Sequence, residues 1–394
     1  MSRILGKRHI RDGLVGVAIL ISMAALLFYP SVAISAAKDG LSLCGNVIIP
    51  SLFPFFVLSS LVVEFGLASY IGHALERIMR PLFNVGGVCS VAFSLGIIGG
   101  YPVGARTAIS LYEKGLCSKT EAERLLSFCN NSGPAFILGV VGAGIFSSSR
   151  VGLILYLAHI LASVFVGILF RFYGREGGSR TAFIPRQTAS VRFYTAFAES
   201  VRGALASTLA ICAFVVFFTV FIKLLFASGA MAAAARFITF FMRPFGMNEA
   251  WAERLLTGII EISSGVASLR GVEAAITSRM AMAAFMLGWA GLSVHCQVLS
   301  FIGQSNLRVH TYIGGKALHG LISAALIFLF SRLWGENITV ASYLAEQING
   351  ISSMGFRSAL TISAAVSWFV WVIFVLIATR AIRKSSGKRR RGEL

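Results

Sequence analysis

The chain has 394 residues, of which 56% are hydrophobic and only 13% are charged, and its mean hydropathy is +0.80. A soluble globular protein carries about twice that share of charged residues, so the composition excludes a soluble enzyme or binding module and indicates a polytopic membrane protein. The net charge of +19 does not indicate a nucleic acid partner, because the basic residues gather at the N-terminus, in the 171–192 loop and in the 380–391 tail. Under the positive-inside rule, these three segments are cytoplasmic, and so are both termini.

Apolar stretches that could cross a membrane recur along the chain. A bilayer core of about 30 Å requires about 20 apolar residues per helix. The first stretch follows a basic N-terminus but is too long for the apolar part of a cleavable signal peptide. The predicted spans are 14–37, 47–69, 132–148, 151–172, 205–227, 282–303, 312–330 and 359–378.

Two further stretches, 86–105 and 257–269, are interpreted as re-entrant hairpins. If the three basic segments are all cytoplasmic, an even number of helices must cross between each pair, and a full span at 86–105 would make that number odd. The second stretch is too short to cross comfortably and contains Glu261. The predicted fold is therefore an all-α polytopic membrane protein with about eight transmembrane helices and two re-entrant hairpins.

A short phrase that occurs twice indicates an internal repeat. Met79-Arg80-Pro81 recurs as Met242-Arg243-Pro244, 163 residues later, and each copy precedes a predicted hairpin by about 20 residues. In the predicted topology the hairpins enter from opposite sides, which makes the halves an inverted repeat suited to alternating access. The expected organisation is a transmembrane helix at 1–40, a first repeat at 41–173, a basic loop at 174–195, a second repeat at 196–333, and a loop, last helix and basic tail at 334–394.

A capping box, Ser118 with Glu121, predicts a helix through 121–128 that is amphipathic and lies at the membrane interface. The segment Asn130–Pro134 then breaks the helix and restarts it. The restarted helix leaves backbone N–H groups that suit an anion or a polar ligand. An ordinary helix cap at the membrane surface is the alternative interpretation.

Breaks within apolar stretches identify the candidate substrate-binding residues, because irregular backbone survives at membrane depth only where it is buried in protein or lines a cavity. The first hairpin turns at Gly99-Gly100, the second at Ser263-Ser264, and the stretch 288–297 is interrupted by polar groups. A glycine-rich turn packed against neighbouring helices is the alternative for the first. The candidates are Gly99, Gly100, Tyr101, Pro102, Asn130, Asn131, Ser132, Gly133, Ser263, Ser264, Ser293, His295 and Gln297.

Three ionisable residues near the breaks each have two interpretations. Glu261 is either a residue that couples transport to a proton or cation, or a structural partner of Arg254 or Arg270. Arg106 either pairs with a substrate carboxylate or is a positive-inside residue at the membrane edge, and the second is favoured. His295 is either a proton switch or a hydrogen-bond partner between helices, and the second is favoured.

The sequence meets no common template for catalysis or metal binding. It contains no H-E-x-x-H, G-x-S-x-G or P-loop motif, and its six cysteines are scattered. An intramembrane hydrolase is therefore a disfavoured alternative. We predict no enzyme activity, metal or cofactor. The expected partners are a small-molecule substrate and the lipid bilayer, without nucleic acid, and the sequence is compatible with an oligomer.

Three motifs resemble those of a known family. Gly-Gly-Tyr-Pro-Val-Gly-Ala (99–105), Glu-Arg-Leu-Leu-Ser-Phe-Cys-Asn-Asn-Ser-Gly-Pro (123–134) and Gly-Leu-Ser-Val-His-Cys-Gln-Val-Leu (291–299) are similar to the YlbJ (SpoVV) sporulation integral membrane proteins. Those belong to the nucleoside-recognition, or gate, domain group, which is related to concentrative nucleoside transporters. The resemblance covers roughly 40–330. The first hairpin tip lacks the acidic residue of nucleoside carriers, which argues against nucleoside specificity and sodium coupling.

The resemblance implies a transporter in the outer forespore membrane of endospore-forming bacteria, with dipicolinate as its cargo. A planar dianion also suits the helix N-termini and the Asn and Ser donors identified above. The predicted function is therefore transport of a small anionic metabolite during sporulation. A nucleoside or nucleobase carrier and a non-transporting membrane scaffold for the spore envelope are the alternatives.

Overall fold

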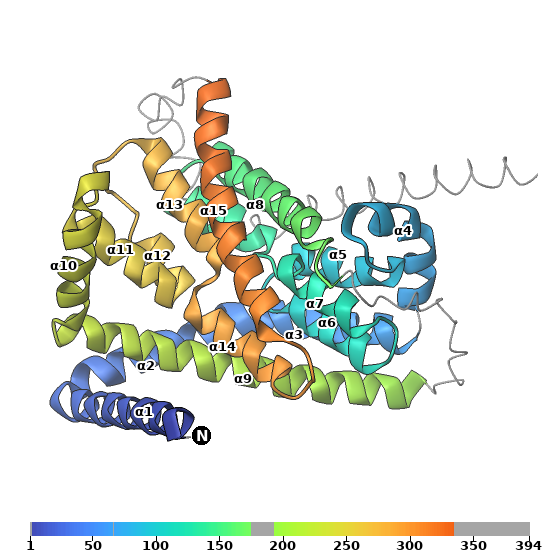
Figure 1. The fold of residues 1–394 in the computed structure, drawn as a ribbon, viewed down its shortest axis with the longest axis horizontal. Coiled ribbons are helices and arrows are strands. Elements are labelled where there is room, and N and C mark those ends of the chain that lie inside the picture. Colours follow the sequence, from blue (N-terminus) through green and yellow to red (C-terminus); the bar gives the residue numbers. More distant parts are fainter. Residues whose placement is uncertain (1, 66, 175–192, 335–394) are drawn as a thin grey trace, which may run out of the picture.

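The structure is a computed structural model, and it describes residues 2–65, 67–174 and 193–334. Every regular element in these ranges is a helix, which confirms the predicted all-α class (Figure 1). The predicted last span, the basic tail and most of the 171–192 loop lie outside the described residues.

Four helical segments in the described ranges are long and apolar enough to cross a membrane, or up to six if each of two bent helix pairs counts as one span. They are α8 (Ser149–Phe170), α9 (Phe193–Ala227), the α13–α14 segment and α15 (Val309–Trp334). α13 (Ile276–Trp289) and α14 (Gly291–Ile302) are separated only by Ala290. All four segments coincide with predicted spans.

The N-terminal span predicted at 14–37 is not straight, which corrects that prediction. α1 (Ser2–Phe28) and α2 (Pro30–Leu43) meet at 98° beside Tyr29. Pro30 occupies the first turn of α2, where its missing N–H costs nothing, but it cannot continue the hydrogen bonding of α1. α2 continues through a π-helical turn into α3 (Ile49–Glu64), and both α2 and α3 pack along α9.

The stretch 86–105, where a re-entrant hairpin was predicted, contains a short helix and the start of a second one. α5 (Ser90–Gly99) follows a 3-10 turn, η2 (Gly87–Cys89), and α6 (Val103–Glu113) leads back. The chain turns at Gly100, as predicted, with a φ of 79° that glycine adopts without strain. The preceding helix, α4 (Leu67–Phe83), meets the first arm of the hairpin at 92°.

The second predicted hairpin breaks slightly earlier than expected. α11 (Glu249–Ile260) and α12 (Ile262–Ala267) are separated by Glu261 alone, whose backbone is extended. The prediction placed the turn at Ser263-Ser264. The turn lies upstream because the Glu261 carboxylate caps α12 and lets the helix restart at once.

Both hairpins cross through glycines at equivalent positions. In the first, a Cβ built on Gly104 would lie 2.9 Å from the Cα of Gly96 and would overlap the carbonyl of Cys129. In the second, a Cβ built on Gly265 would overlap the Cα of Gly258. Glycines let helix backbones touch in this way. The two glycine pairs are separated in sequence by nearly the same 163 residues as the two copies of the repeated phrase. The hairpins are therefore built in the same way.

The helix after the first hairpin begins where the sequence predicts but does not lie at a surface. α7 (Lys119–Phe128) starts at the predicted capping box, with Ser118 and Glu121 exchanging hydrogen bonds of 3.0 and 3.3 Å. Every residue from 121 to 128 is buried, because α7 packs against α6, α8 and α15. The interfacial position was therefore wrong. After α7 the backbone is irregular at 130–133, which shortens the next helix to η3 (Ala135–Ile145).

Helices α13 to α15 stand between the two hairpin regions. Figure 1 shows α11 and α12, with α10 (Ala230–Met242), on the left, and α4 to α7 on the right. The long helix α9 runs along the bottom of this view. The repeated phrase has unequal surroundings: Arg243 is exposed in a 3-10 turn, η4 (Arg243–Phe245), whereas Arg80 belongs to a network.

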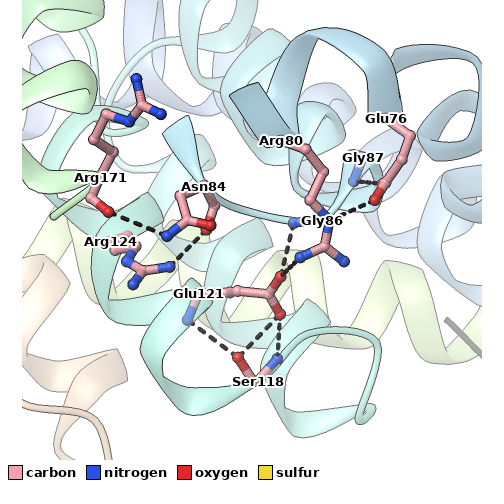
Figure 2. A network of polar contacts seen from close by, with 9 residues as sticks. All are labelled: Glu76, Arg80, Asn84, Gly86, Gly87, Ser118, Glu121, Arg124 and Arg171. Atoms are coloured by element: carbon pink, nitrogen blue, oxygen red, sulfur yellow. Dashed lines mark hydrogen bonds and ion pairs between the residues drawn. The ribbon is translucent and has the colours of Figure 1, made fainter. Parts of the chain in front are cut away.

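Glu121 is the centre of that network, which holds the entrance of the first hairpin (Figure 2). One carboxylate oxygen accepts from the Arg80 guanidinium at 3.1 Å and from the Gly86 N–H at 2.8 Å. The other accepts from the Ser118 N–H and hydroxyl, both at 3.0 Å. Glu76 on α4 accepts from Arg80 and from the Gly87 N–H. Glu121 thus connects α4, η2 and α7 through hydrogen bonds.

Substituting Glu121→Gln should destabilise the protein. A glutamine amide cannot accept all four bonds and has no charge for Arg80, so the expected loss is about 2–3 kcal/mol. Thermal unfolding of the detergent-purified protein would measure it. The matched control is Glu199→Gln, at an exposed position on α9. Equal melting temperatures for the two variants would contradict the role of Glu121.

Candidate functional site

The helices are interrupted at Gly100, at 130–133, at Glu261 and at Ala290, and these four breaks pack against one another in pairs. A Cβ built on Gly100, in the first hairpin, would lie 2.9 Å from the nitrogen of Gly133. A Cβ built on Gly291, just after the α13–α14 break, would lie 3.0 Å from the nitrogen of Ile262 and 3.2 Å from the Cα of Glu261. Each hairpin tip is therefore covered by the break that follows it in the sequence.

Side chains join these two pairs of breaks. The Tyr101 hydroxyl, from the first tip, donates to the carbonyl of Leu287 on α13. The Asn130 amide donates to the Tyr312 hydroxyl at 3.4 Å, and that hydroxyl lies 3.0 Å from Nδ1 of His295 on α14. The breaks thus form one buried polar cluster inside an apolar bundle.

Lys316 of α15 is the cation of this cluster, and its residue is 0% exposed. Its Nζ donates to the Asn130 carbonyl at 2.8 Å and to the Tyr101 hydroxyl at 3.3 Å, and lies 3.4 Å from Nδ1 of His319. It also lies 4.9 Å from the centroid of the Tyr101 ring. Among the described residues the structure gives Lys316 no carboxylate partner. A charge buried in this way is costly, and within a membrane span it indicates function.

His319 lies beside the lysine and His159 packs against His319, and the hydrogen bonds of the two histidines define their tautomers. The rings of His159 and His319 lie 4.3 Å apart. Nε2 of His159 accepts from the Ser132 N–H at 3.0 Å, so it carries no proton. Nε2 of His319 lies 2.9 Å from the His159 carbonyl and must donate to it, which leaves Nδ1 as the acceptor that faces Lys316. Both imidazoles are therefore neutral beside the ammonium group.

Several polar atoms of the cluster have no hydrogen-bond partner among the described residues. They are Oδ1 of Asn130, Oδ1 of Asn131, Nδ1 of His159 and Nε2 of His295, all buried. Native interiors leave few such atoms, and a concentration of them indicates a place where water or a solute binds. The cluster therefore combines a cation without an acid with unpaired hydrogen-bonding groups.

The predicted site residues divide into two groups. The structure brings the first tip (99–102), the Asn-rich break (130–133) and His295 together in the cluster, and Ser293 and Gln297 are buried on the same helix, α14. Ser263 and Ser264 lie at the second tip instead. The backbone N–H groups of these two serines donate to the Glu261 carboxylate at 2.9 and 2.7 Å.

Two local expectations differ from the structure. Within the described ranges Glu261 forms no ion pair with the neighbouring arginines, because Arg254 bonds to the carbonyls of Ala250 and Ser268, and Arg270 bonds to the carbonyl of Gly144. The restarted helix was expected to leave its first N–H groups for a ligand, but those of Phe136 and Ile137 both donate to the carbonyl of Gly133.

Four polar residues of the cluster were not identified from the sequence: Lys316, Tyr312, His159 and His319. Lys316 lies inside the apolar stretch 312–330, so the rule that singled out Glu261 applies to it equally. Tyr312, His159 and His319 gave no such signal, because single polar residues in membrane helices commonly serve only to join helices.

Comparisons with known proteins agree with the resemblance of the three motifs. The family model described as "Nucleoside recognition" (Gate) matches residues 47–179 and 208–305, which together are more than half of the chain. The Sporulation integral membrane protein YlbJ of Bacillus subtilis (strain 168) is 30% identical over 328 residues, covering 79% of this chain and 80% of YlbJ.

Two further similarities are more limited. An uncharacterized protein of Alkalihalophilus pseudofirmus is 33% identical over 98 residues, covering 24% of this chain. The solved structure of CNTnw in an inward-facing substrate-bound state superposes with a TM-score of 0.43 and 14% identity, covering 82% of this chain and 87% of that chain. The family match and the long YlbJ alignment lead to one conclusion: this chain is an integral membrane protein that belongs to the nucleoside-recognition (Gate) family and, within it, to the family of the sporulation protein YlbJ.

Proposed function

We propose that this chain carries a small anionic metabolite across a bacterial membrane. The observation that carries the proposal is the fully buried amine of Lys316, which has no acidic partner among the described residues and lies where the helix breaks meet. An anion that entered the cluster would supply the missing negative charge. The Tyr101 hydroxyl and the Asn130 carbonyl hold the ammonium until then, and carboxylate oxygens would replace them.

The cargo that we propose is dipicolinate, a planar aromatic dianion. One carboxylate would pair with Lys316, and the Tyr101 ring would offer an aromatic face nearby. The cargo and the place of action, the outer forespore membrane, both come from the resemblance to the sporulation family. We further propose that the two hairpins form an inverted repeat that opens the cluster to each side in turn, with both termini in the cytoplasm.

A nucleoside or nucleobase carrier is the second candidate, and the description of the matching family model favours it. The unpaired amide oxygens of Asn130 and Asn131 would suit the donors on a base edge. A buried ammonium group without an acidic partner does not suit an uncharged nucleoside, because the charge would stay uncompensated. We therefore rank the anion first.

Replacing Lys316→Met should abolish most transport without unfolding the protein. Methionine approximates the volume of the lysine stem and removes a buried charge, which proteins commonly tolerate. Loss of a charge-assisted pair should slow uptake roughly 10- to 100-fold. The measurement is uptake of radiolabelled dipicolinate, with uridine in parallel, into proteoliposomes. Lys223→Met, at an exposed position on α9, is the control.

The outcomes of this experiment separate the hypotheses. Uridine uptake without dipicolinate uptake would favour the nucleoside carrier. No uptake of either solute by well-folded wild-type protein would favour a scaffold. Dipicolinate uptake that is unchanged in Lys316→Met would remove the observation on which our proposal depends.

Glu261 remains our candidate for the residue that couples transport to a proton. If its carboxylate carries the proton, Glu261→Gln should reduce uptake driven by a pH gradient to the level seen without a gradient. Glutamine keeps one oxygen to cap α12, so the fold should persist. Glu249→Gln, at an exposed position in the first turn of α11, is the control. An unchanged response to the gradient would limit Glu261 to capping.

A further inference from the structure

A cavity of ≈ 550 Å³ lies apart from the Lys316 cluster, between α3, α6, α9 and α14. Its volume is within the range that small-molecule sites occupy. Hydroxyl groups line it from all four helices, among them Ser59, Ser110, Ser207 and Ser300. None of the residues predicted as site residues from the sequence lines it.

Arg106 supplies the positive charge of this cavity. Its guanidinium donates to the Gly203 carbonyl at 2.9 Å and lies 4.9 Å from the centroid of the Phe56 ring, which is fully buried. Among the described residues, these contacts fix the guanidinium plane but use only one of its five N–H donors. The structure therefore places Arg106 within the helix bundle, rather than at the exposed membrane edge that the sequence favoured.

One acid, Glu113, also lines the cavity, and its negative charge acts on Arg106. Glu113 is seven residues further along α6, or roughly 10 Å at 1.5 Å per residue. It lies beside Lys114, which forms an ion pair with Glu64 of α3. The cavity thus has a basic residue near the start of α6 and an acidic residue in its last turn.

Two segments, α6 with the hairpin tip before it and α14, contribute residues both to the cavity and to the Lys316 cluster. α6 begins just after Tyr101, which contacts Lys316, and carries Arg106 about one turn later. α14 carries His295 in the cluster and Ser300 in the cavity. In each segment the cavity residue follows the cluster residue by five positions, Arg106 after Tyr101 and Ser300 after His295.

We propose that the Arg106 cavity is a second binding site, which takes the carboxylate of the transported solute before or after Lys316 does. The inference rests on the proposed function for the identity of the solute. Arg106 would hold a carboxylate through two parallel N–H···O bonds, and the serine hydroxyls would rotate from their intrahelical bonds to support it. Arg106 and Lys316 would then bind the same anion one after the other.

Protection of a cysteine placed in the cavity tests this site without relying on transport. Ser110→Cys puts a thiol on α6 one turn beyond Arg106, at a half-buried position of the lining. Five of the six native cysteines are buried, and the protein without this substitution measures the background from Cys296. Labelling by an uncharged maleimide would be followed with increasing dipicolinate, with benzylamine as a cationic probe.

We expect dipicolinate to slow the labelling of Ser110→Cys. Adding Arg106→Gln should raise the dipicolinate concentration needed for half-protection at least tenfold, the size expected from losing a charge-assisted pair. Arg279→Gln is the matched control, because Arg279 also donates to a carbonyl, that of Leu269, and also stacks on a ring, that of Phe146, but does not line the cavity. Its half-protection concentration should stay unchanged.

The results distinguish this inference from the proposed function. Protection that persists unchanged in Arg106→Gln, or protection by benzylamine alone, would overturn the carboxylate site. Normal dipicolinate uptake without any protection would also overturn it, while leaving the anion carrier in place. Arg106-dependent protection without uptake would support the site and contradict transport.

Discussion

An interrupted helix exposes backbone N–H and C=O groups, and in an apolar bundle those groups must find partners within the protein. In the described part of this chain, four such interruptions lie against one another. The chain satisfies them by packing them in two pairs and joining the pairs through Tyr101, Asn130 and Tyr312. The polar cluster is thus a consequence of the broken helices: the groups that the breaks release are the groups that hold one another, and they gather where the two halves of the chain meet.

The cluster would be uncharged without α15. That helix crosses beside the breaks without a break of its own and brings Lys316 against the Asn130 carbonyl. His319, three residues further along α15, contacts the Lys316 amine and bonds to the His159 carbonyl of α8, which holds α15 beside α8. The chemistry of the cluster therefore comes from continuous helices, whereas its position comes from interrupted ones. An anion would compensate a positive charge on Lys316, and the Nδ1–H of His159 is a donor without a partner among the described residues.

Much of this arrangement could be predicted from the sequence. Gly100, the irregular backbone at 130–133 and the break at 260–262 were located within one or two residues, because glycine, proline and polar residues rarely gather in an apolar stretch unless the helix breaks there. The burial of α7 could not be predicted, since its polar face is covered by pairing Glu121 and Arg124 with residues distant in sequence. The bend at Tyr29 was overlooked although Pro30 marked it.

The glycine crossings of the hairpins have a consequence for how such proteins diverge. At Gly96 with Gly104, and at Gly258 with Gly265, backbone meets backbone, and no larger side chain fits. Relatives that handle different cargoes cannot change these positions and must vary elsewhere. Residues of α8 and α15 can vary, because their side chains reach the cluster but do not form the helix breaks. A single exchange at position 316 or 319 would change the polar groups of the cluster and leave the helix crossings as they are.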